Sequence, residues 1–444
     1  MPRQLSSPAG LPNHGWRRSR SRVSGREALC AAKRDQMRTW IPLAVALLAS
    51  TAQADPLTYD AALLLAESAA PTLQASALQV EAARAAERAA GRLPDPKLSL
   101  GMENIPVSGP YAGRWDAAEM TMVRVGLMQD IPNAARRRAA AATAQAETQM
   151  AMADTDLQRR EVRVATALAW IDLAYAERRL AVLDQLVEGL SPLWEGVPAG
   201  IESGSARPAA GLEPARLEAE FDNRRSQLAA DVAQARANLT RWTGALHPKT
   251  AGAPPHVEIT PADLRARIAD HPALQVLSAA TQRAAAEVAG ARAARRPDWG
   301  LEVMYGRRDP MFGDMVSAAV TVSLPLFANQ RQDPMIAART AQASRARLLE
   351  ADMRRELAAL LEADLAAYAA NHEQWRRATD VLVPIAEQVA QLETSSYAAD
   401  RADYTDLVEA FTDLADTKLA ALDREALVAR DGARILLTYG SDNP

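Results

Sequence analysis

An internal duplication is the feature of this sequence that most constrains its fold. Motifs found between residues 58 and 244 return in the same order between residues 259 and 440. The matched segments are Pro71–Gln74 with Pro272–Gln275, Arg92–Asp95 with Arg295–Asp298, Val123–Leu127 with Val320–Leu324, Thr143–Ala146 with Thr340–Ala343, and Ser191–Glu195 with Val383–Glu387. One such match between alanine-rich segments carries little weight, whereas five in a constant order indicate a repeated structural unit.

The duplication divides the chain into segments with distinct expected roles. We predict a first repeat at 55–244, a linker containing Pro, Gly and His at 245–260, a second repeat at 261–440 and a tail at 441–444. Each repeat is expected to hold a first helix, two strands around a turn, a very long helix, a break and a last helix. The first helices are expected at 58–92 and 261–295, and the strands at about 97–105, 119–129, 299–306 and 315–326. The predicted class is therefore mainly α-helical with a small β part.

The long helices carry heptad-like apolar seams. The stretch Ala134–Leu190 would extend for about 85 Å at 1.5 Å per residue, which is far longer than a globular domain needs. The seam residues are Val164, Leu168, Ile171 and Tyr175 in the first repeat and Leu382, Ile385, Val389 and Leu392 in the second. A helix of this length needs partners along its whole seam, so the helices are expected to pack as coiled hairpins.

The strand segments alternate apolar and polar residues and are about as long as a tilted strand that crosses a membrane. Half-buried strands of a soluble sheet would show the same alternation. If the strands do cross a membrane, four cannot close a barrel and open edges are not tolerated in lipid, so several chains must combine. Three chains would give 12 strands and a wider water path than two.

The polar side of such a barrel would face the lumen. The residues predicted on that side are Glu103, Met120, Met122, Arg124 and Met128. Thioethers suit soft cations such as Cu(I) and Ag(I), whereas Zn(II) prefers nitrogen and thiolate ligands. Methionines that simply fill irregular space are the plainer interpretation, and no metal site is predicted.

The N-terminal segment resembles a targeting signal. Residues 37–54 combine a short basic start, an apolar run too short to span a bilayer and the small-residue site Ala52–Ala54, which predicts a signal peptide cleaved after Ala54. Residues 1–36 are then interpreted as a disordered or wrongly included extension, with Met37 as the true start. A genuine long basic leader is the alternative.

Removing this segment changes the charge of the chain. Residues 1–54 contain nine of the 51 basic and two of the 55 acidic residues, so the net charge of the remainder is −11 instead of −4. An acidic product disfavours nucleic-acid binding, which needs a basic surface. The single cysteine, Cys30, lies in the removed part, so no disulfide or thiol chemistry is expected.

No catalytic constellation is found in the sequence. The five histidines are scattered and lack HExxH or paired zinc spacing, and the Walker, GxSxG and GxGxxG patterns are absent. The chain is therefore not expected to be an enzyme, and no cofactor is predicted.

Several local motifs, together with the duplicated plan, resemble the TolC family of outer-membrane factors. The motifs are Leu93–Leu100, Met128–Pro132, Val383–Glu387 and Ser396–Arg401 leading to Asp406–Ala410. The segments Leu93–Ile105 and Met120–Pro132 look most similar to the heavy-metal efflux branch, which includes cobalt–zinc–cadmium and copper–silver systems.

The resemblance implies a homotrimer with a 12-stranded barrel among the lipids of the outer membrane and an α-helical coiled-coil barrel in the periplasm. It implies two protein partners, a periplasmic adaptor (membrane fusion) protein and an inner-membrane proton-driven transporter. The expected function is passive conduction of heavy-metal cations, with copper and silver favoured over zinc, cobalt and cadmium. Two alternatives stay open: a drug or protein export duct of the same family, and a periplasmic adaptor or coiled-coil scaffold without a barrel.

The resemblance also implies two kinds of site at the end farthest from the membrane. The helical turns that would meet the adaptor contain Gly204, Ser205 and Ala206 in the first repeat and Asp400, Arg401 and Ala402 in the second. This sequence departs from the family there, because the family often has glycine at the position of Asp400. The periplasmic gate would use Asp406 and Glu409, with Asp403 as a candidate third acid. A solvated acidic helix face is the alternative to a gate.

Overall fold

The computed structural model describes residues 56–114, 116, 118–195, 212–255, 257–399 and 401–440, without the side chains of 190–195 and 213. The predicted extension at 1–36, the predicted signal peptide at 37–54 and the predicted tail at 441–444 lie outside these residues. Within them, the chain is mainly helical with a small β part. The predicted fold class is confirmed.

The first repeat forms two strands beside a set of helices. Its elements are β1 Pro56–Leu57, α1 Tyr59–Ala69, α2 Pro71–Ala89, β2 Lys97–Glu103, β3 Met122–Ile131, α3 Ala134–Glu195 and α5 Glu213–Thr243. At 62 residues, α3 extends for about 90 Å. The short strand β4 Lys249–Thr250 follows and pairs in parallel with β1.

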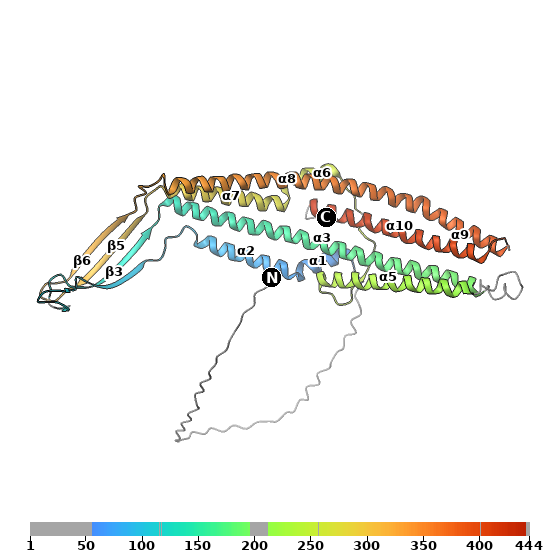
Figure 1. The fold of residues 1–444 in the computed structure, drawn as a ribbon, viewed down its shortest axis with the longest axis horizontal. Helices are drawn as coiled ribbons and strands as arrows, with labels where there is room; N and C mark the ends of the chain where they lie inside the picture. The colour runs from blue at the N-terminus through green and yellow to red at the C-terminus, as the bar shows by residue number, and fades with distance from the viewer. Residues whose placement is uncertain are drawn as a thin grey trace, which may run out of the picture. The chain divides into compact units, whose positions relative to one another are not determined.

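The second repeat follows the same order of elements. They are α6 Pro261–Arg267, the 3-10 turn η2 Ile268–Asp270, α7 Pro272–Ala293, β5 Trp299–Arg307, β6 Met315–Val322, α8 Gln332–Arg377, the π-helical turn η3 Ala378–Leu382, α9 Val383–Ala398 and α10 Tyr404–Tyr439. Figure 1 shows the two repeats side by side, with α3 between α2 and α7.

The first helix of each repeat is interrupted, which contradicts the prediction of continuous helices at 58–92 and 261–295. The chain turns extended at Ala70 and at His271, and a new helix begins at Pro71 and at Pro272. Proline lacks a backbone N–H and disfavours helical geometry in the residue before it, so it starts a helix more readily than it continues one.

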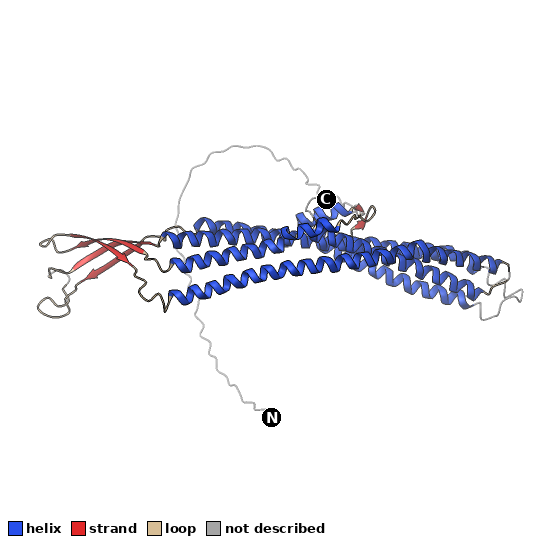
Figure 2. Ribbon diagram, turned by 90° about the horizontal axis from the view of Figure 1, so that it is seen from above, coloured by secondary structure: helices blue, strands red, loops and turns tan. Residues whose placement is uncertain are grey.

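The four longer strands form one antiparallel sheet in the order β2-β3-β5-β6. The central pair joins the two repeats, with Val125 of β3 opposite Tyr305 of β5. The strands β2 and β6 form the two edges. Figure 2 shows the sheet at one end of the long helices.

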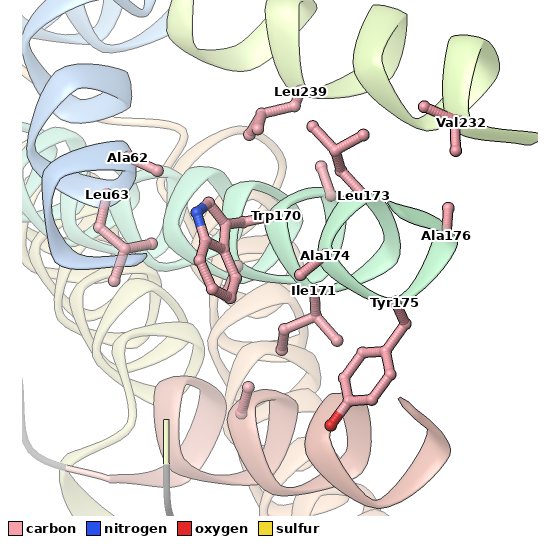
Figure 3. Close-up of a cluster of buried hydrophobic side chains, with 13 residues drawn as sticks. Ala62, Leu63, Trp170, Ile171, Leu173, Ala174, Tyr175, Ala176, Val232 and Leu239 are labelled. Atoms are coloured by element: carbon pink, nitrogen blue, oxygen red, sulfur yellow. The ribbon is translucent and has the colours of Figure 1, made fainter. Parts of the chain in front are cut away.

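The main core lies near the middle of α3, where α1, α5 and α10 pack against it (Figure 3). Trp170 is fully buried, donates a hydrogen bond of 2.8 Å from Nε1 to the Leu57 carbonyl and meets the Tyr59 ring edge-on. Glu177 accepts a hydrogen bond of 2.7 Å from the Thr250 hydroxyl. These contacts fix both β1 and the linker strand β4 to α3.

Among the described residues, no helix is both long and apolar enough to cross a membrane.

Candidate functional site

The sheet has two chemically different faces. The strand register places one apolar set together: Leu98, Leu100 and Met102 of β2, Val123, Val125 and Leu127 of β3, Leu301, Val303 and Tyr305 of β5, and Val316, Val320 and Val322 of β6. These side chains are between 36% and 74% exposed. A contiguous apolar face of this kind indicates contact with lipid or with another protein.

The opposite face is polar and holds an ion-pair network. Arg124 lies in β3, one of the two inner strands, and pairs with Glu103 of β2 and with Glu302 of β5, the latter at 3.5 Å. Lys97 pairs with Asp130 at 2.7 Å on the same face. One arginine thus links strands of both repeats through two carboxylates.

Methionines on the polar face lie over glycines of the neighbouring strand. A Cβ atom built on Gly306 would lie 2.7 Å from Met122 Sδ, and one built on Gly126 would lie 2.5 Å from Ser99 Oγ and 3.1 Å from Met304 Cγ. A side chain at Gly306 would therefore displace Met122, and one at Gly126 would displace Ser99 and crowd Met304. The glycines leave room for flexible thioethers between the strands.

The structure brings most of the predicted lumen residues together. Met122, Arg124, Met128 and Glu103 share the polar face, as the alternation predicted, although their exposure to a lumen stays a prediction. Met120 differs, because β3 begins only at Met122 and Met120 lies in the preceding turn.

Two further members of the polar face, Glu302 and Met304, did not enter the sequence prediction. Their alternation with Leu301, Val303 and Tyr305 is visible in the sequence and could have revealed them.

The acids predicted at the gate lie at the start of α10. Asp403, Asp406 and Glu409 are exposed, whereas Leu407 and Val408 between them are buried. The Asp406 carboxylate accepts a hydrogen bond of 3.1 Å from the Asp403 backbone N–H, and the two residues form a capping box at the start of the helix. Asp406 therefore has a structural role that the sequence prediction did not include.

A groove of about 480 Å³ connects the predicted gate to the predicted adaptor-binding turn. Its lining includes Arg401 and Ala402 of the turn, Asp406 and Glu409 of α10, and Glu393 of α9. The two predicted sites thus share one acidic surface in the second repeat.

The remaining predicted turn residues, Gly204, Ser205, Ala206 and Asp400, lie outside the described residues. Among those that are described, no group of three or more His, Cys, Asp or Glu side chains is arranged to hold a metal ion.

Comparison with known proteins supports the relationship that the motifs indicated. Residues 63–245 match the family model described as "Outer membrane efflux protein". The fold is similar to that of a membrane protein from Pseudomonas aeruginosa, with a TM-score of 0.74 and 16% sequence identity over 86% of this chain and 90% of that chain.

Two named channels have similar folds. CusC gives a TM-score of 0.72 and 16% identity over 86% of this chain and 92% of that chain. The MtrE outer membrane channel of Neisseria gonorrhoeae gives 0.72 and 16% identity over 86% and 89%. A comparison with curated protein sequences gave no match.

The family match covers the first repeat, and the shared fold covers both repeats. The family description agrees with the predicted outer-membrane location and with a transport role that involves no catalysis. The first repeat is therefore similar to the outer membrane efflux protein family, and the fold of both repeats is similar to that of solved outer-membrane channels.

Proposed function

We propose that this chain is the passive outer-membrane duct of a tripartite efflux pump and that it carries heavy-metal cations. Three copies would form a 12-stranded barrel, fed from the periplasm by an adaptor protein and an inner-membrane proton-driven transporter. The observation that carries the proposal is the four-stranded sheet of the described chain, which has one exposed apolar face, one polar face and two unpaired edges. A scaffold without a barrel would leave that apolar face in water.

The proposed cargo rests on the polar face. It places Glu103 and Glu302 beside the thioethers of Met122 and Met304. Carboxylates attract cations, and thioethers favour soft ones such as Cu(I) and Ag(I) over Zn(II). Within the described strands, this face contains no apolar patch comparable to the opposite side, which supports an ionic cargo over apolar drugs.

Deletion of the gene tests the cargo. Growth would be measured on graded copper, silver, zinc, cobalt and organic drugs, in the deletion strain and after complementation. We expect reduced tolerance to copper and silver that the intact gene restores. Unchanged tolerance to every metal with new drug sensitivity would refute the metal assignment and support a drug duct.

We also propose that Asp406 and Glu409 form the periplasmic cation filter. The test is single-channel recording in planar bilayers of a double variant, Asp406→Asn with Glu409→Gln. The amide oxygen of the introduced asparagine can still accept the hydrogen bond from the Asp403 N–H, so the variant removes charge while keeping the helix start. We expect higher conductance and weaker cation preference.

The matched control for the filter is Glu425→Gln. Glu425 lies farther along α10 and accepts a hydrogen bond of 3.0 Å from the Tyr175 hydroxyl. This control removes a charge from the same helix outside the groove, so its selectivity should equal that of the wild type. If the double variant also matches the wild type, Asp406 and Glu409 are not the filter.

A further inference from the structure

Each glycine that the inner strands place on the polar face has a methionine side chain beside it. These glycines are Gly126 of β3 and Gly300 and Gly306 of β5, and all three are buried. In the same order, their Cβ positions would lie 3.1 Å from Met304 Cγ, 3.7 Å from Met128 Cε and 2.7 Å from Met122 Sδ. The glycines therefore leave space on the polar face that thioether side chains occupy.

The space over Gly306 is the point at which three of these thioethers can meet. Met122 of β3 reaches across to β5, so that its sulfur lies over Gly306. Met315 of β6 is the direct cross-strand partner of Gly306, and Met304 lies two residues before Gly306 on the same face of β5. Such neighbours are about 5 Å away across the strands and about 7 Å away along one strand, within reach of long side chains.

The surroundings of these methionines differ from those of a core. Methionine commonly fills irregular gaps between buried side chains. Met315, however, is 41% exposed, and Met122 and Met304 are only partly buried on a face that carries charged groups. Packing therefore explains the three thioethers incompletely, and their sulfur atoms lie where an ion from water can reach them.

The charges nearest to these methionines favour a cation. Arg124 lies directly opposite Gly306 and pairs with both Glu103 and Glu302. One positive and two negative side chains give this cluster a net charge of −1. Arg308, which follows β5, donates hydrogen bonds to two backbone carbonyls of the adjacent turn. The positive charges near the methionines are thus already engaged, and one negative charge remains in excess.

We propose that Met122, Met304 and Met315 form a thioether site over Gly306 that binds a soft monovalent cation, Cu(I) or Ag(I). Thioether sulfur is a soft ligand that suits these ions, whereas Zn(II) prefers nitrogen, thiolate and carboxylate ligands. Glu103 and Glu302 attract cations to the face without coordinating them. The inference rests on the proposed function, because it gives the proposed cargo a defined position on the polar face.

The composition of the thioether site suits an ion that must also leave. Conduction requires binding that is strong enough to admit an ion and weak enough to release it. All three ligands are neutral, so the ion would not be held by a negatively charged ligand. The exposed side chain of Met315 lies on the side from which the ion enters and leaves.

Silver titration of the purified, detergent-extracted protein tests the thioether site. Cys30→Ser removes the single thiol of the full chain, so that no thiolate competes for the metal. Equilibrium dialysis against silver nitrate measures bound Ag(I), and X-ray absorption identifies sulfur among its ligands. We expect one Ag(I) per chain that is lost when all three methionines are replaced by leucine, a substitution that nearly preserves side-chain volume.

A fourth variant tests the geometry while keeping every sulfur atom. Gly306→Ala places a methyl group where it would lie 2.7 Å from the present position of Met122 Sδ. We expect this variant and the single variant Met315→Leu each to weaken Ag(I) binding by at least the roughly tenfold that loss of a supporting contact costs at other metal sites. Met315→Leu keeps the test valid if Gly306→Ala does not fold.

Two matched controls remove a methionine elsewhere on the sheet. Met128→Leu changes the same polar face but lies beside Gly300, and Met102→Leu changes the opposite, apolar face of β2. We expect both to bind Ag(I) as tightly as the parent protein, and an excess of Zn(II) should not displace the bound silver. Loss of binding in Met102→Leu equal to that in Met315→Leu would overturn the assignment.

Recording in planar bilayers separates this inference from the proposed function. A protein that conducts but binds no more Ag(I) than the triple leucine variant would refute the thioether site and leave the duct intact. Ag(I) that is bound through oxygen or nitrogen alone would refute the site as well. A protein that forms no channel would refute the duct, and the silver titration of the same preparation would still decide whether the thioether site exists.

Discussion

The two repeats share one order of elements but differ in how much of their surface a single chain covers. In the predicted seam of the first repeat, Ile171 and Tyr175 are 0% and 2% exposed, whereas Ile385 and Leu392 in the second are 54% and 58% exposed. The helix α3 packs against α2, α5, α7 and α10, while α8 packs mainly against α7 and α10. The comparison shows that one apolar helix seam can lie in the interior of a single chain while another seam of the same chain lies on its surface.

The same substitution, isoleucine to alanine, made in each seam would test this difference most strongly. Ile171→Ala should lower the free energy of unfolding by roughly 2–5 kcal/mol, because it removes buried methyl groups and leaves a cavity. Ile385→Ala should change that free energy by less than about 0.5 kcal/mol in dissociated chains, because its side chain is already half exposed. Denaturant titration followed by helical circular dichroism measures both. Equal losses would show that the two seams are covered alike.

The helix starts at Pro71 and Pro272 offer a second comparison, which depends on pH. Ala70 provides no side-chain cap, whereas His271 accepts a hydrogen bond of 3.2 Å at Nδ1 from the Ala273 N–H. Burial, with the nearby Arg160 cation, lowers the pKa of His271 to about 4, and the Thr438 carbonyl acts in the opposite direction. The folded state therefore favours the neutral imidazole.

The sign of the effect follows from that shift. The neutral His271 side chain makes its full contribution to the free energy of unfolding above pH 6.5. This contribution is lost progressively as the pH falls toward about 4, and it amounts to about 3 kcal/mol at most. His271→Asn keeps an acceptor for the Ala273 N–H but does not titrate, so the free energy of unfolding of this variant should depend less on pH over this range. Unfolding free energies measured from pH 4 to pH 8 check the prediction. Parallel curves for wild type and variant would contradict it.

Asp95 before β2 and Asp298 before β5 offer the third comparison. Replacing each by alanine should give the smallest difference in the free energy of unfolding. Asp298→Ala should cost roughly 1–3 kcal/mol, because the half-buried donors of Asn133 lose their acceptor. Asp95→Ala should leave a dissociated chain unchanged within about 0.5 kcal/mol, because Asp95 has no such partner among the described residues. Thermal unfolding in dilute detergent compares them. A similar loss for Asp95→Ala would show that the first-repeat acid is already engaged within the chain.

Local patterns in the sequence were sufficient for the fold class and for much of the polar face. Period-two alternation predicted the shared face of Met122, Arg124 and Met128, because neighbouring residues of a strand point to opposite sides. The interruptions before Pro71 and Pro272 were missed, because the apolar pattern continues across them and only the proline chemistry reveals the break.

Contacts between distant segments could not be read from the sequence. Paired residues of β3 and β5 are 168 to 184 positions apart, and Asn133 donates hydrogen bonds to Asp298, which is 165 positions away. No local pattern selects either contact. The sequence also did not reveal the capping role of Asp406. An acidic residue at this position is expected both for a gate in the groove and for a helix start, so the residue type alone does not distinguish the two roles. Whether these acids select ions stays a prediction.

The π-helical turn at Ala378–Leu382 changes how helix α9 is rotated about its own axis. Pro384 cannot donate a backbone hydrogen bond, and its ring crowds the carbonyl four residues earlier, which favours a wider turn at this point. One extra residue in a helix rotates everything beyond it by about 100°. The extra residue in the π-helical turn therefore determines which face of α9 is turned toward α10. That face includes Glu393, which lines the acidic groove more than ten positions farther along the chain.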